Sequence, residues 1–193
     1  MQLRKYLPLL VIIIGLLQGC KKDSGGGSNN SSGYFLTASV NGQSWSANVN
    51  STLNNAPAIA ALSTSNGVSI FIVLGIKAVS NDSSAIAVIF PKNVTLNQSF
   101  NFDASQYSES AYVEESAARS TTYYGYNTTS QTGGSGTITI TAYDQTNKIV
   151  EGTFSGTFGS TIGRASVQVT NGKFRCPYTT DVNQLPKSGG LKF

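Results

Sequence analysis

The stretch from Gly136 to Phe158 reads GTITITAYDQTNKIVEGTFSGTF and places polar and apolar residues in alternation around a polar centre. Before the centre, Ile138 and Ile140 alternate with threonines, and after it Phe154 and Phe158 fall on one face. A period of two residues is that of a β-strand with one buried face. The stretch therefore predicts a β-hairpin.

The register of this hairpin depends on the length of its loop. A five-residue loop from Asp144 to Lys148 places Ile140 opposite Gly152, whereas a four-residue loop would place Ile140 opposite Glu151. We therefore predict the longer loop, with Asn147 in a left-handed conformation. The predicted pairs are Ala142 with Val150, Ile140 with Gly152, Ile138 with Phe154 and Thr139 with Thr153.

Three Asn-Gly pairs, which begin at Asn41, Asn66 and Asn171, mark further turns. The first two predict hairpins with the pairs Val40 with Gln43, Ala38 with Trp45, Leu36 with Ala47, Tyr34 with Val49, Leu62 with Phe71, Ala60 with Val73, Ala61 with Ile72 and Ile59 with Leu74. Both faces of the second hairpin are apolar, which predicts interior strands with Val68 to Ile76 central. At Asn171 the alternation fits a hairpin as well as a β-bulge.

Strand patterns separated by polar turns extend over most of the chain. Only 11% of its residues are charged, so hydroxyls and amides supply the polar faces. Gly152 and Gly156 leave room for large side chains of a neighbouring strand. No segment has a long helical period, although Ser108 to Arg119 could form one or two turns of helix. We predict an all-β fold, a single antiparallel β-sandwich or up-and-down barrel-like domain built from hairpins.

The N-terminus has the pattern of a lipoprotein signal. Arg4 and Lys5 precede an apolar run from Leu7 to Leu17, which is shorter than the roughly 20 residues that a membrane-spanning helix needs. The following Leu17-Gln18-Gly19-Cys20 resembles a bacterial lipobox. The resemblance implies cleavage before Cys20 and attachment of several acyl chains, palmitate among them, to this cysteine. Several chains would hold the protein on a membrane essentially permanently.

This signal divides the chain into residues 1–19, the signal peptide; 20–33, the lipidated cysteine and a Gly/Ser/Asn tether; 34–182, the β domain; and 183–193, a C-terminal tail. Cleavage removes Arg4 and Lys5 from the 13 basic residues and leaves 11, against 9 acidic residues. The mature chain is therefore nearly neutral, and its longest basic cluster is Lys21-Lys22. Both observations argue against a nucleic-acid partner.

Three segments of the β domain stand out together: Phe35 to Trp45 (FLTASVNGQSW), Gly136 to Phe154 (GTITITAYDQTNKIVEGTF) and Val167 to Phe174 (VQVTNGKF). In combination they resemble a family of uncharacterised Bacteroidetes lipoproteins, the DUF6252 type. Membership would imply an all-β domain on an outer-membrane lipoprotein of a Gram-negative cell envelope, either facing the periplasm or exposed at the surface. The family brings no catalytic residues. The segment from Asn101 to Gln131 matches least well.

The chain contains no histidine, which excludes Ser-His-Asp and Cys-His catalytic sites and the usual zinc sites. With Cys20 committed to lipid, Cys176 has no partner for an internal disulfide. The alternation of Cys176 with Phe174 and Tyr178 places it on an apolar face, which predicts a buried core residue.

Carboxylates are the remaining candidates for catalysis or for a cation site. Glu109, Glu114 and Glu115 are the acids that cluster in the sequence. A carboxylate-dependent hydrolase needs two placed acids, but the adjacent Glu114 and Glu115 would point apart on a strand. A calcium site from Asp103, Glu109 and Glu114 lacks the usual Asp-x-Asp-x-Asp-Gly spacing. We therefore expect no enzyme, no metal and no cofactor.

Five tyrosines form the other unusual cluster: Tyr107, Tyr112, Tyr123, Tyr124 and Tyr126. Exposed tyrosines on a rigid β scaffold can stack on sugars or contact a protein, although they are also ordinary strand residues. We predict a non-enzymatic structural or interaction protein of the cell envelope. Its expected partners are the membrane, through the lipid anchor, and a glycan or an envelope protein. The alternatives are a module that binds carbohydrate or peptide through these tyrosines, and a carboxylate-dependent hydrolase.

Overall fold

The computed structural model describes residues 33–65, 67–80, 82–102, 108–116, 119–125, 134–160, 162–181 and 184. Within these ranges the regular elements are the strands β1 (Phe35–Val40), β2 (Gln43–Ser46), β3 (Ala58–Ser65), β4 (Val68–Val79), β5 (Asp82–Pro91), β6 (Ser99–Asn101), β7 (Glu109–Ser116), β8 (Arg119–Tyr124), β9 (Ser135–Asp144), β10 (Ile149–Ser160) and β11 (Val167–Thr179). The predicted all-β class is confirmed.

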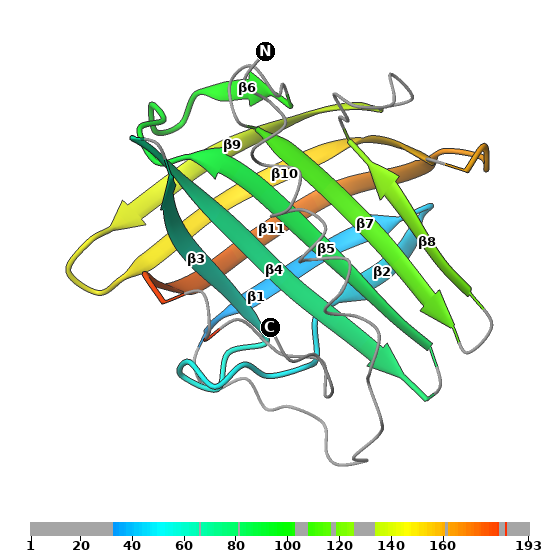
Figure 1. Cartoon of the computed structure of the whole chain (residues 1–193), viewed down its shortest axis with the longest axis horizontal. Helices are drawn as coiled ribbons and strands as arrows, with labels where there is room; N and C mark the ends of the chain where they lie inside the picture. Colours follow the sequence, from blue (N-terminus) through cyan, green and yellow to red (C-terminus); the bar gives the residue numbers. More distant parts are fainter. Residues whose placement is uncertain are drawn as a thin grey trace.

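The strands form one continuous sheet that folds into two layers (Figure 1). The front layer in this view contains β3, β4, β5, β7 and β8. The back layer contains β2, β1, β11, β10 and β9, and β6 pairs with β9 at its margin. The front strands cross the back strands, which is the arrangement of two packed and twisted layers.

Two short pairings join the layers at their edges. The end of β11 pairs with β3 through Tyr178 and Thr179, and the end of β10 pairs with β8 through Gly159 and Ser160. Since β10 and β11 also pair with each other, the strands between these two joints close into a ring. The β3–β11 pairing is parallel and the other described pairings are antiparallel, so the sheet is mixed.

The two-residue turns at Asn41 and Gly67 produce the predicted central pairs. Across β1 and β2, Val40 faces Gln43 and Ala38 faces Trp45. The four predicted pairs of β3 with β4 also form: Ile59 with Leu74, Ala60 with Val73, Ala61 with Ile72 and Leu62 with Phe71. β4 lies between β3 and β5 and has a fully buried central run, so it is the interior strand that its apolar sequence predicts.

The first hairpin ends earlier than predicted. The amides of Asn48 and Val49 donate to the carbonyl of Ile76 on β4, at 2.9 and 3.1 Å, so the predicted pairing of Tyr34 with Val49 is wrong. The side chain of Asn48 also donates to the carbonyl of Ala78 at 3.0 Å and accepts from its amide at 2.8 Å. β4 extends past Gly75, the last of its residues that pairs with β3. The residues that follow β2 therefore form the backbone hydrogen bonds that β3 does not supply to this end of β4.

The third hairpin keeps the predicted core pairs but not the predicted loop. The pairs Ile140 with Gly152, Thr139 with Thr153 and Ile138 with Phe154 form. However, Asp144 pairs with Ile149, so the loop has four residues and not five. Ala142 consequently faces Glu151, and the extra residue Thr141 forms a β-bulge that returns the apolar side chains to their predicted partners.

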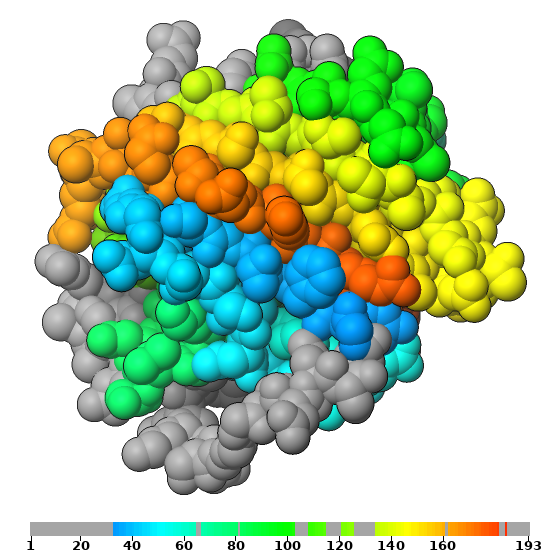
Figure 2. Space-filling view, turned by 180° about the vertical axis from the view of Figure 1, so that it is seen from behind, coloured from blue at the N-terminus to red at the C-terminus, as the bar shows by residue number. Residues whose placement is uncertain are grey.

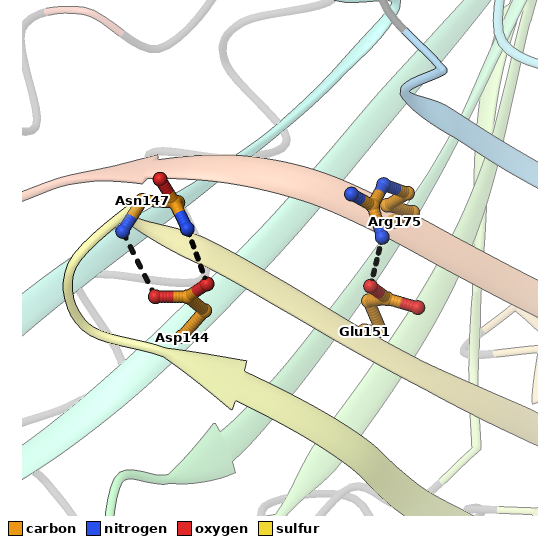
Figure 3. A network of polar contacts seen from close by, with 4 residues as sticks. All are labelled: Asp144, Asn147, Glu151 and Arg175. Carbon is orange, nitrogen blue, oxygen red and sulfur yellow. Dashed lines mark hydrogen bonds and ion pairs between the residues drawn. The ribbon is translucent and has the colours of Figure 1, made fainter.

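The left-handed residue of this loop is Lys148, with a φ of 53°, and not Asn147 as predicted. Asn147 is instead tied to Asp144 (Figure 3). The Asp144 carboxylate accepts hydrogen bonds from the backbone amides of Asn147 and Thr146, both at 2.9 Å, and from the Asn147 side chain at 2.7 Å. These bonds, those from Asn147 foremost, lower the pKa of the Asp144 carboxyl.

The alternation at Asn171 is restored by a bulge and not by a hairpin. β11 continues through this position, where Asn171 adopts a left-handed backbone with a φ of 53°. On β10, Ser155 alone lies opposite both Thr170 and Asn171. Because of the extra residue, the apolar side chains before and after the bulge both point to the buried face of β11.

The predicted helical turns between Ser108 and Arg119 are wrong. Glu109 to Ser116 form β7, which pairs with β5 on one side and with β8 on the other. Partners on both sides satisfy the backbone of this segment and bury Ala111 and Val113. The weak helical spacing of the sequence is overridden by this pairing.

The main apolar core lies between the layers. It includes the predicted residues Ile138, Ile140, Phe154 and Phe158. A Cβ atom at Gly152 would lie 2.6 Å from Cζ of Phe174, so this glycine makes room for the aromatic ring of the neighbouring strand, as predicted. Cys176 is buried in the same core, as predicted, and burial raises the pKa of its thiol.

The outer faces of the two layers differ in polarity. On the front layer, β4, β5 and β7 carry a second buried apolar cluster: Ile70, Ile72, Leu74, Ile76, Ala85, Ala87, Ile89 and Val113. On the back layer, Glu151 and Arg175 lie opposite each other and form an ion pair at the surface (Figure 3). The back layer therefore has the pattern of a sheet with one solvated face, whereas β4 is buried on both faces.

Candidate functional site

A cleft lies at one end of the sandwich, where the turn between β1 and β2 faces the ends of the front strands. Its volume is about 510 Å³. The back layer contributes Val40, Asn41, Gln43, Ser44 and Trp45 to its lining. Figure 2 shows this side of the molecule. The green end of the β4–β5 hairpin lies at the lower left, below the blue and cyan segment that contains β2. The cleft is therefore built from both layers.

A row of polar side chains forms the front wall of the cleft. Lys77 of β4 pairs with Ser84 of β5. Ser84 pairs in turn with Glu114 of β7, and Glu114 pairs with Thr121 of β8. Residues that pair across strands point to the same face, so the row faces the back layer. Because the residues deeper along these strands are apolar, the row marks the boundary of the core.

Two aromatic side chains form the inner end of the cleft. Trp45 is buried, and its Nε1 donates a hydrogen bond to Oγ of Ser84 at 2.8 Å. The hydroxyl of Tyr112 donates to Oε1 of Glu114 at 3.0 Å, and Glu114 is the strand partner of Ser84. Burial and the charge of Glu114 raise the pKa of Tyr112, so its hydroxyl stays protonated at neutral pH. Ser84 and Glu114 therefore satisfy the polar atoms of the two aromatic side chains.

Three of the five tyrosines that were predicted to form one contact surface lie in the described part of the chain, and the structure does not bring these three together on one surface. Tyr112 lines the cleft, and the ring of Tyr123 packs beside it with centroids 6.0 Å apart. Tyr124 lies on the other face of β8 because adjacent strand residues alternate. The prediction requires exposed side chains and is wrong for these three tyrosines, because Tyr112 and Tyr123 are each 5% exposed and Tyr124 is 6% exposed. Tyr107 and Tyr126 lie outside the described residues.

The carboxylates of β7 are also separated. Glu109 pairs with Ile89 and lies on the outer face of the front layer, whereas Glu114 lies in the cleft. Burial raises the pKa of Glu109. The pKa of Tyr124 is also raised, mainly by burial and to a smaller extent by the charge of Glu109. Since Glu109 and Glu114 point to opposite faces, they cannot share a calcium ion. Within the described ranges, no group of three or more His, Cys, Asp or Glu side chains could hold a metal ion.

Of the predicted contact residues, the cleft contains Tyr112 alone among those described. Two signals in the sequence point to the other lining residues. Trp45 is the single tryptophan of the chain, and the apolar runs of β4 and β5 become polar at Lys77 and Ser84, on either side of one turn. These signals do not place Trp45 beside Ser84, because the two residues belong to different hairpins.

Comparisons with protein families, with curated proteins and with solved structures find no match to this chain. The resemblance to the DUF6252 type therefore stays a prediction. In the described part of the chain, no helix has the length and apolar character to cross a membrane. Cys20, the signal peptide and the tether up to residue 32 lie outside the described residues.

Proposed function

We propose that this chain is a lipid-anchored protein of the cell envelope whose β domain binds a partner molecule in the cleft and catalyses no reaction. The observation that carries the proposal is the cleft itself, with a polar front wall, buried aromatics and open volume of about 510 Å³ between the layers. The side-chain amides of Asn41 and Gln43 and the hydroxyl of Thr121 give it neutral donors and acceptors. Such a lining suits a polar ligand with many hydrogen-bonding groups.

The lipid anchor rests on the sequence Leu17-Gln18-Gly19-Cys20 after a basic and then apolar N-terminus. An anchored domain on a Gly/Ser/Asn tether can reach partners near the membrane without touching lipid itself. The proposed location is the outer membrane, with the domain facing the periplasm or the cell surface.

A binding role is favoured over catalysis because the chain lacks histidine and its cleft combines few ionisable groups. The charged residues of the cleft are Lys77, Asp82 and Glu114. Glu114 already accepts the hydrogen bond of Tyr112. The candidate ligands are an extended polypeptide and a glycan of the envelope.

The single tryptophan permits a direct test. Because Trp45 lines the cleft, its fluorescence should change when the cleft is filled. The full chain in detergent would be titrated with cell-wall polysaccharide and with extended peptides. Replacing both Lys77 and Glu114 by alanine should reduce the response, whereas Lys173→Ala, an exposed change on the back layer, should not. A folded protein whose Trp45 emission responds to neither ligand class would refute the proposal.

A further inference from the structure

β2 is an edge strand with a free side. It is the first strand in the order of the sheet, and among the described strands only β1 pairs with it. The amide of Ala47 donates to the carbonyl of Leu36 at 3.0 Å, which sets the alternation of hydrogen bonds between β1 and β2. By this alternation the backbone groups of Ser44 and Ser46 point away from β1. β2 therefore offers two amides and two carbonyls on its free side.

The front strands extend past this free side of β2 (Figures 1 and 2). The last pair of the β4–β5 hairpin is Val79 with Asp82, which lies beyond the pair Lys77 with Ser84. Val79 points to the same face as Lys77, because the two are separated by one residue, and it is 54% exposed. Both Val79 and Asp82 line the cleft. The cleft thus occupies the place that one more strand of the back layer would take.

We propose that an extended polypeptide segment of a partner protein adds to β2 as a further strand and directs every second side chain into the cleft. This inference rests on the proposed binding function and names the class of ligand. Strand addition would satisfy the free backbone groups of Ser44 and Ser46 with hydrogen bonds from the main chain of the added segment. These bonds do not depend on the side chains of that segment. It would also cover the exposed side chain of Val79.

The cleft selects which side chains point inward. Val79 provides an aliphatic contact, and Asp82 and Glu114 provide two negative charges against the single positive charge of Lys77. A segment that matches this lining therefore carries an aliphatic and a basic residue among the alternate positions whose side chains point into the cleft. β2 spans four residues, so the segment needs about six residues, or roughly 20 Å, to cover it and the adjoining rim.

A polypeptide fits this cleft better than a sugar. Sugar recognition by stacking needs an exposed aromatic face, but Trp45 and Tyr112 are exposed by only 4% and 5%. Their polar atoms are also engaged, with Ser84 and Glu114. The free backbone of β2 has no such engagement with a second strand among the described residues.

The probe is a capped six-residue peptide with the sequence Thr-Val-Thr-Lys-Thr-Val. Binding to the full chain in detergent would be measured by Trp45 fluorescence and by calorimetry. Two further peptides carry N-methyl groups, one on all threonine amides and the other on the valine and lysine amides. Only one set of amides can face β2, so one methylated peptide should bind like the parent. The other should bind more weakly by roughly three- to tenfold for each hydrogen bond lost.

The protein side of the test uses matched substitutions at one position. Ser44→Pro removes the outward amide of β2 without removing a bond to β1, and proline is tolerated at such edge positions. Ser44→Ala removes the hydroxyl and keeps the amide. The proline variant should lose affinity for the parent peptide by at least about threefold, which corresponds to one hydrogen bond, and the alanine variant should retain it. Circular dichroism would verify the fold of both variants.

The outcomes separate this inference from the proposed function. Binding in which both methylated peptides match the parent, or in which a folded Ser44→Pro variant binds normally, would overturn strand addition. If the proline variant does not fold, the pair of methylated peptides still decides. A Trp45 response to polysaccharide but not to any peptide would refute the polypeptide ligand and leave a binding function for the cleft. No response to either class would refute both.

Discussion

Trp45 and Ser84 connect the two layers of the sandwich at the inner end of the cleft. The indole Nε1 of Trp45, on β2, donates to the hydroxyl oxygen of Ser84, on β5, at 2.8 Å. The same serine pairs across the sheet with Glu114, which accepts the hydrogen bond of the Tyr112 hydroxyl. One small side chain thus satisfies the polar atom of a buried indole and orients the aromatic end of the cleft.

Ser84→Ala should destabilise the fold by about 1 to 3 kcal/mol, because it leaves the buried Nε1–H of Trp45 without an acceptor. Ser83→Ala, at the next position of β5, should cost less than about 0.5 kcal/mol. Urea denaturation of both variants would measure the difference. Equal free energies of unfolding would show that the bond between Trp45 and Ser84 contributes nothing to stability.

Phe154→Ala should cost about 3 to 5 kcal/mol, because the side chain is buried in the core between the layers. Thr139, which pairs with the adjacent Thr153, points to the outer face of the back layer, where its hydroxyl forms a hydrogen bond with that of Ser99 at 2.6 Å. Thr139→Ala should therefore cost about 1 kcal/mol or less. A chemical denaturation series checks both values, and similar losses would contradict the register of β9 with β10.

Gly152→Ala should destabilise by about 1 to 3 kcal/mol through overpacking. The added Cβ would lie 2.6 Å from Cζ of Phe174 and 2.7 Å from the carbonyl oxygen of Thr139. The second contact is with backbone, which cannot move aside without disturbing the sheet. Ser155→Ala on the same strand is the control, and thermal unfolding is the measurement. A Gly152→Ala protein as stable as the control would refute the crowding.

Glu109→Gln should raise the thermal stability at pH 7 and leave it unchanged at pH 4. Burial raises the pKa of Glu109 above its ordinary value of 4.5, which means that folding favours the protonated form. The stability contributed by this protonated carboxyl is present below pH 4.5 and is lost as the pH rises through the folded-state pKa. Glutamine stays neutral and avoids the loss. Melting temperatures at the two pH values test this, and a destabilised variant at pH 7 would contradict it.

Cys20→Ser should abolish metabolic acyl labelling and leave the precursor uncleaved, because the lipid-bearing sulfur is removed. Cys176→Ala should keep the label, since that thiol is buried in the core. Gel mobility and labelled fatty acid incorporation measure both effects. Normal labelling of the serine variant would exclude the proposed anchor.

The tertiary structure departs from the sequence pattern where one extra residue enters a strand. The alternating residues on either side of the loop correctly predict that Ile140 faces Gly152. They assign the additional residue to the loop, whereas the structure places it at Thr141 as a bulge. Both solutions give the same core pairs, so local patterning does not distinguish them. Asp144 decides between them by capping the shorter turn.

The predicted tyrosine surface fails for a related reason. Sequence shows which residues share a face of a strand, but not which face is covered by another layer. Tyr112 and Tyr123 face the opposing layer and are buried by it, while Tyr124 lies on the other side. Burial of a strand residue depends on strands distant in the sequence.

By itself the sequence determined that this protein is all-β and which core residues pair across its hairpins, and it predicts Cys20 as an anchor. These properties depend on a two-residue period, on short turns and on a contiguous motif, all of which are local. Only the tertiary structure decided how β3 meets β11, how the layers close, and where the cleft opens. Those features arise from contacts between distant segments, such as Trp45 with Ser84 at a separation of 39 residues, and no local pattern encodes them.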